Sequence, residues 1–134
     1  MSVAFIVGAG DYIGAAIAKR FAKGGFTVCM GRRNGEKLVP LIAQIESAGG
    51  KAHGFSMDAR LEESVATTFE KVEQTLGPID VVISNVGGNV QFNIEDTTTR
   101  VFRKVWEMAT FSGFLVGREA AKYMVPRKAG SIFF

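Results

Sequence analysis

The stretch VAFIVGAGDYIG, residues 3–14, runs from a continuous apolar segment directly into a glycine-rich turn. An apolar residue at each of its first five positions is typical of a strand buried on both faces of a sheet. Ile13, Ile17 and Phe21 then recur at helical spacing, and Gly24-Gly25 ends that helix. The stretch therefore predicts a strand, a tight turn and a helix, which is the first unit of a parallel sheet.

The rest of the chain repeats this alternation of short apolar runs and longer stretches of helical period. Further strands are predicted at residues 26–30, 51–57, 79–84 and 130–134, and further helices at 38–48, 62–76 and 99–125. Apolar strands that alternate with helices imply a parallel sheet covered on both faces, and right-handed crossovers make the fold doubly wound. We therefore expect a three-layer α/β/α fold with strand order 3-2-1-4-5. Trp106 and the phenylalanines of the last helix are expected in the core.

The composition limits the classes of function. The 134 residues carry a formal net charge of +3, and 22% are charged, with basic and acidic residues dispersed among one another. A nucleic-acid-binding face is not indicated, because no basic stripe with interleaved aromatic residues occurs. The single cysteine, Cys29, lies in an apolar run and excludes an internal disulfide. With no membrane-length apolar run and no targeting segment, the expected location is the cytoplasm.

The turn after the first strand is the strongest candidate for a binding site. Glycine at Gly8, Gly10 and Gly14 allows a sharp turn and a close approach of the backbone to a pyrophosphate. The following helix offers unpaired N–H groups and a partial positive charge at its N-terminus. The alternative is a tight turn without a ligand, but a strand before the motif and a helix after it favour binding.

The end of the second strand predicts which dinucleotide is bound. An acidic residue at that point would hold a ribose 2′-hydroxyl, whereas arginine accommodates a 2′-phosphate. This chain has Gly31-Arg32-Arg33-Asn34 there and no acidic residue. Guanidinium groups match phosphate oxygens, so NADP(H) is favoured over NAD(H), which stays possible. The alternative is two solvated arginines in a loop.

Several segments together resemble the short-chain dehydrogenase/reductase family along essentially the whole chain. Residues 7–14 resemble its T-G-x-x-x-G-I-G segment, 57–59 resemble its D-V element, and 84–87 resemble its N-N-A-G segment. Each segment follows a predicted strand, at the edge where open α/β sheets bind ligands.

The resemblance implies a Rossmann-type NAD(P)-binding domain over residues 1–134. It implies carbonyl or alcohol hydride transfer on a small molecule, and a homo-oligomer formed through the long fourth helix. The acid of the D-V element, Asp58 here, would receive the adenine amino group; an N-cap of the next helix is the alternative role. The implied cofactor-binding residues are Gly8, Gly10, Asp11, Tyr12, Ile13, Gly14, Arg32, Arg33, Asp58, Ala59, Asn85, Val86 and Gly87.

Three residues depart from the family's pattern. Tyr12 replaces the middle glycine of the turn, and Gly10 restores part of the lost clearance. Thr110 stands where the family carries an asparagine in the fourth helix. Asp11 occupies a position that is often basic in members preferring NADP(H), and a carboxylate there would repel a 2′-phosphate.

The catalytic serine and the Tyr-x-x-x-Lys pair of the family are not found in the sequence. Tyr12 and Tyr123 are followed four positions later by Ala16 and Arg127, and the chain ends in the fifth predicted strand. We expect a truncated NADP(H)-dependent oxidoreductase, its catalytic and substrate part absent; the alternative is a noncatalytic nucleotide-binding or dimerising module. No metal site is predicted, because the only histidine, His53, has no cysteine or acidic cluster at ligand spacing.

Overall fold

The computed structural model describes residues 1–88 and 90–134 of the chain. Its sheet contains β1 (Val3–Val7), β2 (Thr27–Arg32), β3 (Lys51–Ser56), β4 (Ile79–Ser84) and β5 (Ser131–Phe133). All four pairings are parallel, and the order β3-β2-β1-β4-β5 confirms the predicted topology. β3 lies at an edge of the sheet, as the predicted order implies, and one of its six residues is buried.

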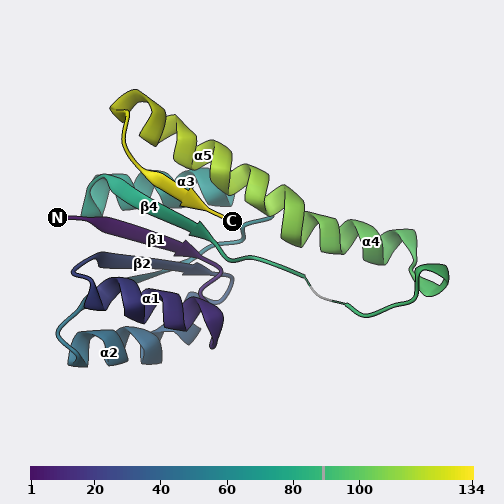
Figure 1. Ribbon diagram of the computed structural model, residues 1–134, viewed down its shortest axis with the longest axis horizontal. Coiled ribbons are helices and arrows are strands. Elements are labelled where there is room, and N and C mark those ends of the chain that lie inside the picture. The colour runs from purple at the N-terminus through teal and green to yellow at the C-terminus, as the bar shows by residue number, and fades with distance from the viewer. Residues whose placement is uncertain (89) are drawn as a thin grey trace.

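Helices cover both faces of the sheet and make it a three-layer structure (Figure 1). One core cluster contains Val3, Phe5 and Val7 of β1, together with residues of α3 (Glu62–Leu76) and α5 (Ser112–Arg127). The other contains Ala4 and Ile6, with residues of α1 (Ile13–Lys23) and α2 (Val39–Ser47). Because successive side chains of a strand point to opposite faces, the wholly apolar β1 supplies both cores.

The helix predicted over residues 99–125 is interrupted. It consists of α4 (Thr99–Trp106), a π-helical turn η3 (Glu107–Phe111) and α5, with the 3-10 turn η2 (Ile94–Asp96) before it. None of the eight residues of α4, all of them described, is buried. The expectation that the aromatic residues of this helix belong to the core is therefore wrong for Phe102, Trp106 and Phe114, which are exposed.

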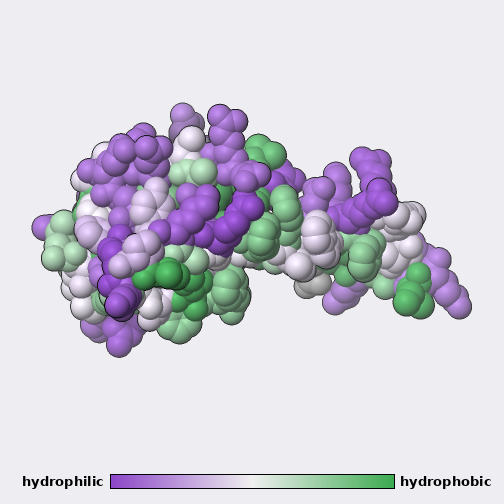
Figure 2. All heavy atoms as spheres, turned by 90° about the horizontal axis from the view of Figure 1, so that it is seen from above, coloured by the Kyte–Doolittle hydropathy of each residue, from purple (hydrophilic) through white to green (hydrophobic). Residues whose placement is uncertain are grey.

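The physical reason for this exposure is the position of α4. Figure 1 shows that α4 extends beyond the end of the sheet, so no strand lies beneath it. Figure 2 shows the same segment as an arm that projects from the body of the molecule, with apolar residues among polar ones along it. None of the helices in the described part of the chain has the length and hydropathy that a membrane-spanning segment requires.

Candidate cofactor-binding site

The strand register brings the predicted motifs to one edge of the sheet. Val7 at the end of β1 is paired with Gly31 of β2 and with Ser84 of β4. The Gly8 N–H donates to the Gly31 carbonyl at 2.8 Å, and the Asn85 N–H donates to the Val7 carbonyl at 2.8 Å. The glycine turn therefore lies between the segments that follow β2 and β4.

Close packing explains two of the glycines in the turn. Gly8 has φ +85°, and a Cβ there would lie 2.6 Å from the carbonyl oxygen of Asn85. A Cβ at Gly14 would lie 2.6 Å from the Cα of Ala9. Gly10 differs, because no described atom beyond its chain neighbours lies within 4 Å of a Cβ built there. Its open side faces the cleft described next.

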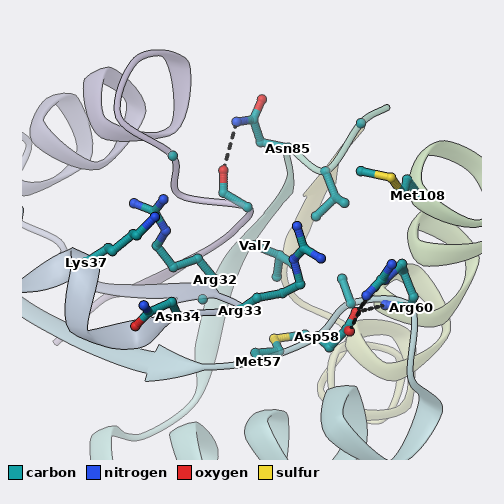
Figure 3. A pocket seen from close by; sticks show the side chains of 16 residues that line it. Val7, Arg32, Arg33, Asn34, Lys37, Met57, Asp58, Arg60, Asn85 and Met108 are labelled. Atoms are coloured by element: carbon teal, nitrogen blue, oxygen red, sulfur yellow. Dashed lines mark hydrogen bonds and ion pairs between the residues drawn. The ribbon is translucent and has the colours of Figure 1, made fainter. Parts of the chain in front are cut away.

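A cleft of about 540 Å³ opens at this edge of the sheet (Figure 3). Its walls come from the segments that follow β1, β2, β3 and β4, together with one residue of η3. The lining residues are Val7, Gly8, Gly10, Gly31, Arg32, Arg33, Asn34, Lys37, Met57, Asp58, Ala59, Arg60, Asn85, Val86, Gly87 and Met108.

Nine of the predicted cofactor-binding residues line the cleft, whereas Asp11, Tyr12, Ile13 and Gly14 are not part of its lining. The Tyr12 side chain does not fill the hollow beside the turn, because Tyr12 is 86% exposed and not part of the lining. Ile13 is also exposed, and Gly14 packs inside the turn. What these residues offer a ligand is their backbone N–H groups and not their side chains, since the first N–H groups of a helix have no intrahelical partner.

Basic side chains gather where β2 ends. Arg32 donates from Nη1 to Oδ1 of Asp11 at 3.0 Å, with side-chain exposures of 20% for Arg32 and 74% for Asp11. Asp11 therefore neutralises Arg32 across the turn, an ion pair that sequence reasoning did not predict. Arg33 forms no ion pair with any described residue.

Two further polar residues of this wall were missed. Asn34 caps the 3-10 turn η1 (Gly35–Leu38), its Oδ1 accepting from the Glu36 N–H at 3.2 Å, and Lys37 follows within that turn. The signal was available in the sequence, because Asn is a preferred N-cap and a capped turn holds the following residues beside the strand end.

Asp58 lies in the cleft and is not a helix cap, since the N-cap position of α3 is Leu61. Its carboxylate accepts from Arg60 at both oxygens, Nε to Oδ1 at 2.9 Å and Nη2 to Oδ2 at 2.7 Å. This bond from Arg60 is the main reason that the pKa of Asp58 lies below its ordinary value. Arg60 was not singled out from the sequence, and its spacing from Asp58 was the only signal.

The β4 side of the cleft is uncharged. Asn85 donates from Nδ2 to the Gly8 carbonyl at 3.0 Å and so ties the two loops together. Val86 and Gly87 continue this wall, and Met108 reaches it from η3. Thr110, also in η3, is exposed and lines a separate hollow with Phe114 and Phe134, so the structure does not bring it to the cleft.

No group of three potential metal ligands occurs among the described residues. His53 lies in the edge strand β3 and is exposed. Cys29 is buried in β2, and burial raises its pKa to about 12, so the thiol stays protonated at neutral pH.

Comparison with known proteins agrees with this arrangement. The family model for short chain dehydrogenases matches residues 2–134. A 2-dehydro-3-deoxy-D-gluconate 5-dehydrogenase from Formosa agariphila is 30% identical over 97% of this chain and 50% of its own length. A gluconate 5-dehydrogenase from Gluconobacter oxydans is 30% identical over 96% of this chain and 50% of its own length.

Solved structures agree in fold. A short-chain dehydrogenase from Rhodopseudomonas palustris superposes with a TM-score of 0.93 and 54% identity, covering 99% of this chain and 62% of that one. A variant of actinorhodin polyketide ketoreductase, solved with NADPH, superposes with a TM-score of 0.93 and 28% identity, covering 98% of this chain and 51% of that one. The chain spans about half the length of the curated relatives it matches. By the family match over nearly its whole length, this chain belongs to the short-chain dehydrogenase/reductase family.

Proposed function

We propose that this chain is the cofactor-binding part of an NADP(H)-dependent oxidoreductase acting on a carbonyl or alcohol group of a small molecule. When bound, the nicotinamide would supply or accept the hydride. The main support for this proposal is that Arg32, Arg33 and Lys37 line the same cleft as the glycine turn. The backbone N–H groups at the start of α1, which follows the turn, suit a pyrophosphate, and cationic side chains suit a further phosphate on the ribose.

The charge balance of the cleft supports NADP(H) even with Asp11 present. Arg32, Arg33, Lys37 and Arg60 provide four positive charges, while Asp58 and the neighbouring Asp11 provide two negative ones, which leaves a net charge of two positive. Asp11 is already paired with Arg32, so its charge is compensated before a phosphate arrives. Arg33, without an ion pair to any described residue, is the free guanidinium that would bind a 2′-phosphate as a fork.

Titration calorimetry with NADPH and NADH tests this proposal. Arg33→Asp should weaken NADPH binding by about tenfold or more, the effect of one lost charge-assisted contact, and should leave NADH binding nearly unchanged. Arg33 is a sharper target than Arg32, because Arg32→Asp would also set two carboxylates against each other. Arg103→Asp on exposed α4 is the matched control. Equal affinities for both cofactors in the unaltered chain and in Arg33→Asp would refute the preference for NADP(H).

We also propose that the chain of 134 residues binds the cofactor without turning it over. Neither tyrosine has a lysine four positions later, so the pair that protonates a carbonyl in this family is missing from the sequence. Absorbance at the nicotinamide band, followed with aldehydes and ketones, should show no turnover beyond background. A robust rate from a sample of verified mass would contradict this.

Finally, we propose that two copies associate through α4. Phe102 and Trp106 are 64% and 46% exposed, and the Trp106 ring stacks on Phe111 with ring centroids 5.6 Å apart. Aromatic side chains are enriched at protein interfaces. Sedimentation velocity should give a dimer that Phe102→Ser weakens. Lys104→Ser, which replaces an exposed basic residue on the same helix, serves as the control. A monomer at all concentrations would exclude this interface.

A further inference from the structure

The pairing of Arg60 with Asp58 limits how the Asp58 carboxylate can interact with a ligand. Oδ1 accepts two hydrogen bonds, from Nε of Arg60 at 2.9 Å and from the Arg60 N–H at 3.0 Å. Oδ2 accepts one, from Nη2 of Arg60 at 2.7 Å. Each carboxylate oxygen can accept about two bonds. Within the described contacts, only Oδ2 keeps an acceptor position free.

The same pairing determines the orientation and the charge of the carboxylate. Two parallel bonds from a planar guanidinium prevent the carboxylate from rotating about its bond to Cβ, which a single bond would permit. The side-chain bond from Arg60 is the largest cause of the lowered pKa of Asp58, and the charge of Arg33 adds to it. Asp58 therefore stays ionised and acts only as an acceptor at neutral pH.

The composition of the cleft suits a flat base. Met57, Ala59, Val86 and Met108 contribute apolar groups to its lining, in which Asp58 is the one acidic residue among those described. Figure 3 shows Arg33, Asp58 and Arg60 grouped at the same end of the cleft. A purine would place its faces against apolar groups there and one polar edge toward the carboxylate.

We propose that Arg60 is a positioning residue for base selection. It holds the Asp58 carboxylate so that Oδ2 accepts a hydrogen bond from an amino group on the base, and it thereby excludes bases with an oxo group at that edge. An oxo oxygen facing an ionised carboxylate oxygen would leave two acceptors opposed. This inference rests on the proposed function, since it concerns the dinucleotide bound in the same cleft.

The experiment compares NADPH with its deaminated analogue, in which hypoxanthine replaces adenine, by titration calorimetry. The unaltered chain should prefer NADPH by about tenfold to hundredfold, the range for one hydrogen bond to a charged group. Arg60→Ala should reduce this ratio to within about threefold. Arg60→Lys, which keeps the charge but cannot form the fork, should give an intermediate ratio. Arg103→Ala, on exposed α4, should leave the ratio unchanged.

The ratio separates positioning from simple destabilisation, because a partly unfolded variant loses affinity for both cofactors in proportion. Should Arg60→Ala fail to fold, Arg60→Lys provides the decisive comparison. An unchanged ratio in these variants overturns the inference, and so does tighter binding of NADPH after Arg60→Ala, since Arg60 would then compete with the base. If the unaltered chain binds neither cofactor, the proposed function itself fails, which is distinguishable from binding with an unaltered ratio.

Discussion

Two loops of the molecule begin alike and end differently. The residues after β1 and those after β4 both leave a central strand at the same edge of the sheet, and both lead to a helix. Five residues, 8–12, separate β1 from α1, which folds back so that Gly14, Ala15 and Ala18 are buried. Residues 85–98 separate β4 from α4, which has no buried residue in its described length and projects away (Figure 1).

The difference lies in the turn and not in the helices. Gly8 and Gly14 permit backbone contacts that any side chain would prevent, so the helix must start directly above the sheet. The connection between β4 and α4 is longer, and its length does not require α4 to begin directly above the sheet. An amphipathic pattern indicates which side chains share a face of a helix, but the connection decides whether anything lies opposite that face.

The largest expected effect concerns the turn. Gly8→Ala would force a residue with a Cβ to φ +85° and place that Cβ against the Asn85 backbone. We expect a loss of about 3 kcal/mol or more in the free energy of unfolding, together with loss of cofactor binding. Gly87→Ala, in the second loop, has open space around the new Cβ among the described residues and should cost little. Urea denaturation measures both, and equal costs would refute the contrast between the loops.

A smaller effect is expected where the two loops meet. Asn85→Ala removes one of two hydrogen bonds to the Gly8 carbonyl, which keeps the bond from the Gly10 N–H at 2.9 Å. We therefore expect the free energy of unfolding to fall by about 0.5–1.5 kcal/mol, the net contribution of one hydrogen bond. Asn93→Ala, at an exposed position later in the same connection, is the control. If both substitutions had the same effect on the denaturation midpoint, the loops would not be coupled through Asn85.

The exposed helix should tolerate changes that the core cannot. Trp106→Ser removes a stacked but solvent-exposed ring and should change the free energy of unfolding of the monomer by about 1 kcal/mol at most. Phe69→Ala, in the core beside Phe5, should cost about 3–5 kcal/mol. Denaturation at low protein concentration makes the comparison. A large loss from Trp106→Ser under these conditions would mean that α4 is covered in the monomer.

The smallest expected effect is the pH dependence of stability, and it contrasts the wall of the cleft that holds Asp58 with the uncharged wall formed by residues 85–88. Residues 85–88 carry no ionisable side chain, whereas Asp58 has a pKa lowered from the ordinary value of 3.8. A carboxyl group with a lowered pKa stabilises the fold above its ordinary pKa, and this contribution is lost as the pH falls through the lower, folded-state value. The difference in melting temperature between the unaltered chain and Arg60→Ala should therefore be largest near pH 7 and shrink below pH 3.8.

This contribution is at most about 1 kcal/mol, because both partners are partly exposed. Arg103→Ala should show no such trend, since Arg103 forms no ion pair with a described residue. A constant difference between pH 7 and pH 3 would show that the Asp58 carboxylate does not depend on Arg60.

Much of the site could be predicted because its parts are local. Gly8, Arg32, Asp58 and Asn85 each lie at or just after the end of a predicted strand, and parallel register brings the ends of such strands together. Side-chain pairing was not predictable in the same way. The Asp11–Arg32 ion pair joins residues 21 positions apart, and its formation depends on the distance between two turns.

The sequence by itself determined the strand order, the two-sided core and the edge at which the cleft forms, because these follow from the periodicity of apolar residues and the handedness of crossovers. The tertiary structure alone decided which cations are already paired, which oxygen of Asp58 stays available and which helix remains uncovered. Those properties depend on the relative placement of separate segments and on side-chain orientation, and a one-dimensional pattern does not specify either.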